Sequence, residues 1–388
     1  MKKAVLMLED GTCFEGSSCG ADGEAYGEIV FNTSMTGYQE ILTDPSYKGQ
    51  IVTMTYPEIG NYGIVDDDAE SRCLQAEGFV VKEMSKIKSN WRAGMTLGAY
   101  LKAHGKQAIE GIDTRALTRH IRDFGAMKSV LSTVDFNKDS LRKKVKESPS
   151  IVGIDLAKQV TVEKPYKWSG KLKPVGMMIN EDRYVRVGNN KTKLKVTAFD
   201  CGMKNNILRI LTDLNCEVTV VPIDTKAEDV LKTNPDGIFI SNGPGDPSAV
   251  PYIVEELKKL LGKKPIFGIC FGHQLLAQAL GGKTYKLKFG HRGANHPVMD
   301  TRTKKIDITV QNHGFAVDLK SLKKLKHKVE VTHINLNDKT IEGIEVKKLK
   351  AFSIQHHPEA SAGPHDARYI FNHFIDLMIQ AKKKTNKK

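Results

Sequence analysis

Residues 268–274 read Gly-Ile-Cys-Phe-Gly-His-Gln and lie between two segments with different patterns. The apolar run 265–269 is short and flanked by lysines, which is typical of a buried strand. Leucine and alanine then recur at helical spacing over 275–280, and the glycine pair 281–282 ends the helix. A Gly-x-Cys-x-Gly turn between strand and helix predicts a nucleophile elbow, which exposes Cys270 at the edge of a sheet. The positive end of the helix dipole favours its thiolate.

A lone cysteine is more often a small buried hydrophobic residue, so a catalytic role requires a base and a group that orients the base. Residues 351–359 read Ala-Phe-Ser-Ile-Gln-His-His-Pro-Glu, and the apolar alternation up to Ile354 predicts a strand. Pro358 keeps His357 out of the helical region, so we expect the strand to continue through the histidine. Residues two apart share a face of an extended chain. Glu359 should therefore orient His357 toward the nucleophile, while His356 points to the opposite side.

A third segment supplies backbone donors. Residues 236–240 read as another buried strand and are followed at 241–247 by Ser-Asn-Gly-Pro-Gly-Asp-Pro. Taken alone, this segment is an ordinary turn. At the carboxyl end of a parallel strand, however, such a loop lies where open α/β sheets bind ligands. One of its N–H groups, together with that of Phe271, is a candidate oxyanion hole.

These three motifs resemble a class I, triad-type glutamine amidotransferase domain, with Cys270, His357 and Glu359 as its catalytic residues. Three further blocks, at 31–47, 55–63 and 111–119, are similar to the N-terminal domain of the carbamoyl-phosphate synthase small-subunit family. The resemblance covers nearly the whole chain. The triad motifs are shared among amidotransferases, whereas the N-terminal blocks are specific to this one family.

The resemblance also implies a set of contacts to glutamine. Gln274 lies one helical turn after the nucleophile and should face the same pocket. Asn312 and Gly314 follow the alternating run 306–310, so we expect them at a strand end. Ser46 has the pattern of a turn residue, and its role rests on the resemblance alone. The implied contacts are Ser46, Gly243, Gly245, Phe271, Gln274, Asn312, Gly314 and Phe315.

The resemblance implies a glutaminase subunit that hydrolyses glutamine to glutamate and ammonia. A large synthetase subunit would receive the ammonia through an internal tunnel and make carbamoyl phosphate from bicarbonate and ATP for arginine and pyrimidine biosynthesis. The chain has no match to the P-loop pattern, so we expect no cofactor here, and ATP and Mg in the partner. Two alternatives remain open: a stand-alone cysteine hydrolase of γ-glutamyl compounds, and a non-catalytic nucleic-acid-binding protein.

Charge and cysteine content indicate which partners, metal sites and cellular location to expect. The net charge is +14, but the lysines are scattered and no basic stripe is interleaved with aromatic residues, so we expect a solvated surface and no nucleic acid. Part of the excess charge would complement an acidic partner. The six cysteines show neither C-x-x-C pairs nor zinc spacing, which indicates no metal site and a reducing, cytoplasmic location. No signal peptide or membrane-spanning segment is predicted.

We predict a mixed α/β N-terminal domain over 1–150 that docks the partner, a connector over 151–192, an amidotransferase domain over 193–380 and a disordered basic tail over 381–388. In the N-terminal domain we expect helices near 95–104 and 114–123. From Leu194 onward strands and helices alternate, which predicts an α/β fold with a doubly wound, mainly parallel sheet. Its site should lie at the carboxyl ends of the strands.

Overall fold

The computed structural model describes residues 2–170, 192–323, 325 and 327–385, and the chain divides into two compact units. The N-terminal unit comprises Met1–Leu156, Pro244–Asp246 and Leu287–Ala294. The C-terminal unit comprises Ala157–Gly243, Pro247–Lys286 and Asn295–Lys388. Each unit buries its own hydrophobic clusters.

The N-terminal unit is built on a closed barrel of seven short strands. In barrel order these are β1 (Lys3–Leu8), β2 (Cys13–Ser18), β8 (Gln107–Glu110), β6 (Gly78–Val80), β4 (Gln50–Met54), β3 (Glu24–Asn32) and β9 (Met127–Ser132). A separate two-stranded sheet pairs β5 (Glu58–Ile59) with β7 (Glu83–Met84). The helices are α1 (Tyr38–Thr43), α2 (Leu97–Ala103), α3 (Thr114–Phe124) and α4 (Lys138–Glu147).

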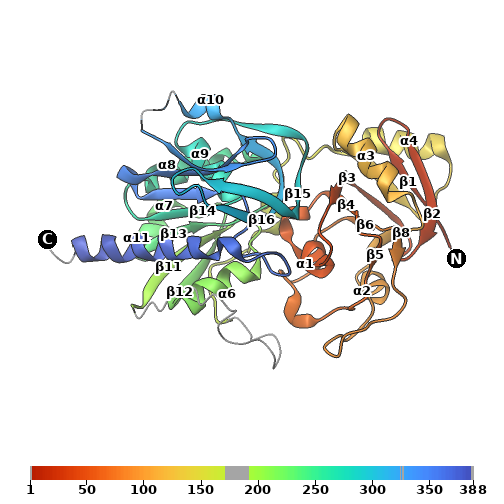
Figure 1. Cartoon of the computed structure of the whole chain (residues 1–388), viewed down its shortest axis with the longest axis horizontal. Helices are drawn as coiled ribbons and strands as arrows, with labels where there is room; N and C mark the ends of the chain where they lie inside the picture. Colours follow the sequence, from red (N-terminus) through yellow and green to blue (C-terminus); the bar gives the residue numbers. More distant parts are fainter. Residues whose placement is uncertain (1, 171–191, 324, 326, 386–388) are drawn as a thin grey trace. The chain divides into compact units, whose positions relative to one another are not determined.

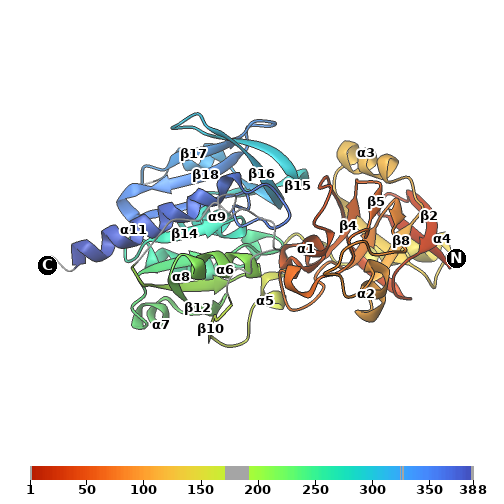
Figure 2. The same ribbon diagram turned by 60° about the horizontal axis from the view of Figure 1, so that its bottom comes forward.

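The two helices predicted in this unit form and lie on opposite sides of its strands, as Figure 2 shows for α2 and α3. Helix α3 begins at Asp113, whose side chain accepts a hydrogen bond from the N–H of Ala116. Leu117 and Ile121 recur one turn apart and pack with barrel residues such as Ile109. The solvent-facing side of the helix carries exposed arginines, Arg115, Arg119 and Arg122.

The C-terminal unit contains a ten-stranded sheet, in which five consecutive strands are parallel. In order these are β12 (Cys216–Pro222), β11 (Leu194–Asp200), β13 (Gly237–Ile240), β14 (Ile266–Ile269) and β19 (Ala351–Ile354). They are short and apolar because helices cover both of their faces. The predicted doubly wound, parallel arrangement is confirmed for this part of the sheet.

The two faces of the parallel strands are covered by different helices. Ile238 and Ile240 pack with residues of α7 (Ala227–Lys232), α8 (Pro251–Leu260) and α9 (Phe271–Ala279). Phe239, which lies between them in β13, faces the other way and packs with α6 (Asn205–Asp213) and α11 (Ile370–Thr385). Figure 1 shows α11 running beside β13 and β11. Within the described residues, no helix is both long and apolar enough to cross a bilayer.

The other half of the sheet is largely antiparallel and was not predicted. Strand β19 pairs antiparallel with β18 (Ile341–Val346), which pairs with β17 (Glu330–Asn335) and then with β15 (Thr284–Asp300). The last strand is β16 (Ile306–Val317), and the short helix α10 (Leu319–Leu322) follows it. Antiparallel strands need no helical crossover, so the β–α alternation that identified the parallel half is missing here.

The predicted connector and the predicted basic tail are only partly covered by the described residues, and the covered parts contain regular structure. Residues 171–191 of the predicted connector fall outside the described residues. The earlier part contains α5 (Ala157–Val160) and β10 (Tyr166–Lys167), which pairs with β12. The prediction of a disordered tail is wrong for 381–385, which form the end of α11, while 386–388 fall outside the description. Lysines in the last turn interact favourably with the helix dipole, and Lys382 Nζ lies 3.0 Å from Asp236 Oδ2.

Candidate active site

Three adjacent parallel strands bring the predicted motifs to one edge of the sheet. Strands β13, β14 and β19 are neighbours, and they are followed by 241–247, Cys270 and 355–359 respectively. The Gly272 N–H donates to the Ser241 carbonyl at 3.0 Å, and the Cys270 N–H donates to the Ile354 carbonyl at 2.8 Å. These hydrogen bonds join all three segments. The site therefore lies at the carboxyl ends of the strands, as predicted.

The turn at Cys270 is a nucleophile elbow. Cys270 is the N-cap of α9 and has φ 53° and ψ −100°, a strained conformation for a residue with a side chain. A Cβ on Gly272 would lie 2.3 Å from the Ile240 carbonyl oxygen, and one on Gly268 would lie 2.6 Å from that of Gly272. Only glycine permits such close approach of strand and helix. The predicted sharp turn is confirmed.

The expectation that Cys270 is exposed is wrong, because the residue is only 2% exposed. Its sulfur touches two polar groups from other segments. Sγ lies 3.6 Å from the carbonyl oxygen of Asn312 in β16, which accepts from the thiol. It also lies 3.5 Å from Nε2 of Gln355, which follows β19. The Cys270 thiol thus lies near both a backbone acceptor and a side-chain donor.

His357 and Glu359 form the expected base–carboxylate pair, with 2.7 Å between His357 Nδ1 and Glu359 Oε1. The expectation that the strand continues through the histidine is wrong, because β19 ends at Ile354. Beyond it the chain leaves the sheet ladder: the His357 N–H donates to the Val310 carbonyl in β16, and Pro358 has no N–H to continue the pairing. His356 lies apart from the pair, with Nδ1 3.6 Å from Glu342 Oε2.

A carboxylate at Nδ1 fixes the tautomer of a neutral imidazole, with the proton on Nδ1 and the lone pair on Nε2. His357 Nε2 is buried and has no hydrogen-bond partner among the described residues. The unshared lone pair is what a general base requires.

Glu359 is fully buried, yet it is held ionised by a buried cation. Burial raises the pKa of the Glu359 carboxyl, but the Lys204 ammonium and then His357 outweigh this, so that the pKa falls to about 2. Lys204 Nζ lies 2.5 Å from Glu359 Oε1. The amide of Asn206 donates to the Glu359 carbonyl, which anchors the backbone as well. The carboxylate is therefore charged and fixed in position.

Five of the implied glutamine contacts lie in α9 and β16, the helix that follows Cys270 and the strand whose backbone its sulfur contacts. Phe271 is the first residue of α9, and Gln274 lies in the same turn, with its amide donating to the Phe315 carbonyl at 2.8 Å. Asn312, Gly314 and Phe315 lie inside β16, so the expectation that Asn312 and Gly314 sit at a strand end is wrong. Their strand extends beyond the alternating run as far as Val317.

The remaining implied contacts are distributed between the units. Gly243 belongs to the C-terminal unit, in the loop after β13. Gly245 and Ser46 belong to the N-terminal unit. Ser46 is buried in a short 3₁₀ turn, and its N–H donates to Asp44 Oδ1 at 2.9 Å.

Sequence reasoning missed two residues of this site, Lys204 and Gln355. Gln355 had only a weak signal, its place directly after the predicted strand and two residues before His357, because the chain leaves the extended conformation at this point. Lys204 had none. It precedes a helix far away in the sequence, and only the folded chain brings it to Glu359.

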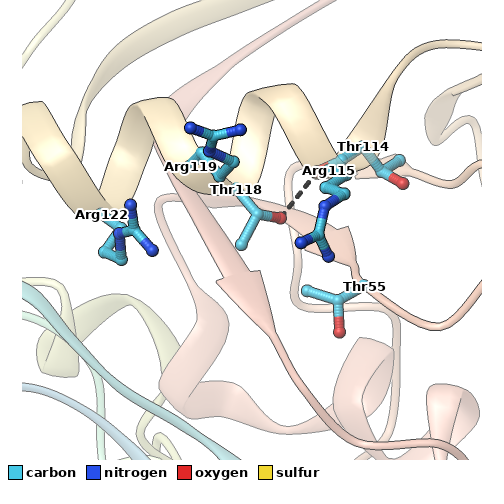
Figure 3. Close-up of a pocket in the computed structure, with 6 residues that line it drawn as sticks. All are labelled: Thr55, Thr114, Arg115, Thr118, Arg119 and Arg122. Atoms are coloured by element: carbon cyan, nitrogen blue, oxygen red, sulfur yellow. Dashed lines mark hydrogen bonds between the residues drawn. The ribbon is translucent and has the colours of Figure 1, made fainter.

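A second concave surface lies on α3 in the N-terminal unit. It has a volume of about 420 Å³, and its lining contains no carboxylate. Figure 3 shows the six residues that line it, which are Thr55, Thr114, Arg115, Thr118, Arg119 and Arg122. Arg122 forms a salt bridge with Asp123, whereas Arg115 and Arg119 take part in no salt bridge found within the described residues.

Comparisons with known proteins agree with both halves of the chain. Residues 197–377 match the family model for class-I glutamine amidotransferases, and residues 6–131 match the model for the carbamoyl-phosphate synthase small chain, CPSase domain. The carbamoyl phosphate synthase small chain of Syntrophotalea carbinolica is 56% identical over 97% of this chain and 98% of its own length. That of Rhodopirellula baltica is 52% identical, covering 97% of this chain and 96% of its own length. That of Solidesulfovibrio magneticus is 50% identical, covering 99% of this chain and all of its own length. The chain therefore belongs to the glutamine-hydrolysing carbamoyl phosphate synthase small-chain family.

Proposed function

We propose that Cys270, His357 and Glu359 hydrolyse the side-chain amide of glutamine. The observation that carries the proposal is the buried pair of His357 Nδ1 and Glu359 Oε1 at 2.7 Å, on the chain that follows the strand beside the elbow. The pair leaves Nε2 of His357 as the base for the Cys270 thiol.

In the reaction, His357 takes the proton from Cys270, and the resulting thiolate attacks the amide carbon so that a C–S bond forms. Backbone N–H groups at Phe271 and in the 241–247 loop stabilise the oxyanion. The imidazolium, held by Glu359, gives its proton to the leaving nitrogen, and ammonia departs. Water then attacks the thioester, His357 accepts its proton, and glutamate is released as the C–S bond breaks.

We further propose that the ammonia passes through an internal tunnel to a large synthetase subunit, which binds ATP and Mg and makes carbamoyl phosphate from bicarbonate. Arginine and pyrimidine biosynthesis would use the product. Family membership over nearly the full length supports such a partner over a stand-alone γ-glutamyl hydrolase or a nucleic-acid-binding protein. The six cysteines are free, which fits a reducing cytoplasmic compartment.

The arginine-lined cavity of α3 supports a docking role for the N-terminal unit. Arg115, Arg119 and Arg122 are exposed and occupy one face of the helix, since residues three and four apart are neighbours. Arg122 is paired with Asp123, whereas Arg115 and Arg119 form no salt bridge within the described residues, and carboxylates of a second chain would relieve the repulsion between their charges. We assign this face to acidic side chains of the synthetase subunit.

The decisive experiment measures glutamate release by the purified chain with and without the synthetase subunit, ATP and bicarbonate, beside Cys270→Ser. We expect weak basal hydrolysis, a large increase in the complete mixture and almost no activity in the variant. Rapid hydrolysis that ignores the partner would contradict the assignment as a subunit. Full activity of Cys270→Ser would contradict the assignment of the nucleophile.

A further inference from the structure

Gln355 is buried beside the nucleophile, and no step of the mechanism above uses it. It is the first residue after β19, and its side chain is fully buried. Its N–H donates to the Glu342 carbonyl at 2.8 Å, which fixes its backbone against β18. Its amide nitrogen Nε2 lies 3.5 Å from the Cys270 sulfur.

The orientation of this amide follows from a chain of contacts that ends on the backbone. The carbonyl oxygen of Phe315 can only accept, so the group of Gln274 that faces it at 2.8 Å must be its NH₂. The same NH₂ lies 3.1 Å from Oε1 of Gln355 and donates a second hydrogen bond to it. With its oxygen turned to Gln274, Gln355 presents its own NH₂ to Cys270. The opposite orientation would set two NH₂ groups against each other.

The two groups at the sulfur suit different protonation states. The Asn312 carbonyl accepts a hydrogen bond from the thiol but repels a thiolate. The Gln355 NH₂ is a donor, and hydrogen bonds to a charged acceptor are stronger than those to a neutral one. Gln355 therefore favours the thiolate and offsets the effect of Asn312.

We propose that the side-chain amide of Gln355, held in register by Gln274, is a catalytic group that stabilises the Cys270 thiolate before glutamine is attacked. The role rests on the proposed function, in which Cys270 is the nucleophile. Gln355 is thus a neutral hydrogen-bond donor that favours the thiolate. It acts in addition to the base His357 and the positive end of the helix dipole. This arrangement also gives Gln274 a positioning role, through Gln355, that does not require contact with substrate.

The test follows alkylation of Cys270 by iodoacetamide as a function of pH in the full-length chain, with the modified peptide identified by mass spectrometry. Exposed Cys73 serves as the internal reference thiol. Gln355→Met removes the donor at similar volume. Gln278→Met is the matched control. Gln278 lies on α9, the helix that follows Cys270, and its amide donates to the Thr284 hydroxyl, away from the nucleophile.

In Gln355→Met we expect the pH of half-maximal alkylation to rise by about one unit, a roughly tenfold loss of thiolate at neutral pH. In the complex with the synthetase subunit, kcat should fall with little change in KM. Gln278→Met should match the wild type. Superimposable alkylation profiles for Gln355→Met and the wild type would overturn the proposal.

If Gln355→Met does not fold, as judged by thermal melting, Gln355→Leu is the alternative because it is smaller than methionine. It has no donor either, so the profile should move in the same direction. An unchanged profile in that variant would equally overturn the proposal. Alkylation needs no turnover of glutamine. A wild type that fails to hydrolyse glutamine would therefore refute the proposed function while leaving this test intact.

Discussion

Lys204 Nζ lies 2.5 Å from Glu359 Oε1, and both side chains are buried. Removing one partner of a buried ion pair leaves the other charge unpaired, which costs about 3–5 kcal/mol. We expect Lys204→Met to lower the free energy of unfolding by that order and to reduce glutamine hydrolysis, since Glu359 would no longer be held ionised beside His357. Chemical denaturation and glutamate release measure the two effects.

The control for this prediction is Lys167→Met, which removes an exposed lysine 2.9 Å from Glu217. Exposed pairs contribute little, so its unfolding free energy should change by less than about 1 kcal/mol. Equal losses of unfolding free energy in the two variants would show that burial does not make the Lys204–Glu359 pair more important for stability than an exposed pair.

Stability at acid pH should depend on the same carboxylate. The pKa of Glu359 is about 2 in the folded chain against an ordinary 4.5, so its contribution is complete above pH 4.5 and is lost as the pH falls toward 2. That contribution is at most about 3 kcal/mol. We expect the double variant Lys204→Met/Glu359→Gln, which removes both buried charges, to lose less stability than the wild type over this interval. Unfolding curves recorded at several pH values test this, and parallel pH dependences would contradict it.

The elbow should tolerate no side chain at Gly272. A Cβ there would lie 2.3 Å from the backbone oxygen of Ile240, which cannot move without displacing β13. We expect Gly272→Ala to destabilise the chain by about 2 kcal/mol or more and to abolish glutamine hydrolysis. Gly94→Ala is the control, because its nearest neighbour would be 4.0 Å away, and it should melt within a few degrees of the wild type.

The arginine face of α3 should govern association with the synthetase subunit and leave hydrolysis by the free chain unchanged. We expect Arg115→Glu with Arg119→Glu to weaken binding about tenfold or more and to reduce its salt dependence, as measured by titration calorimetry at two ionic strengths. Lys143→Glu on α4, another exposed basic position, is the control. Unchanged affinity in the arginine variant would show that this face is not part of the interface. Free phosphate compounds would then be the next ligands to test at this face.

The parallel half of the sheet and the elbow could be predicted because their signals are local. A buried strand, a glycine-bounded cysteine and a helical repeat stand next to one another at 265–280. The barrel of the N-terminal unit has no such signal, because its closure depends on pairs such as Ser17 with Glu110 that are distant in sequence. Lys204 was missed for the same reason.

Strand β16 supplies three backbone carbonyls to the site: Val310 binds the N–H of His357, Asn312 accepts from Cys270, and Phe315 accepts from Gln274. His357, Cys270 and Gln274 are thus all hydrogen-bonded to one strand. A displacement of that strand along its own axis would alter all three contacts together. We therefore expect glutamine hydrolysis to depend on the position of β16 as well as on the residues of the proposed triad.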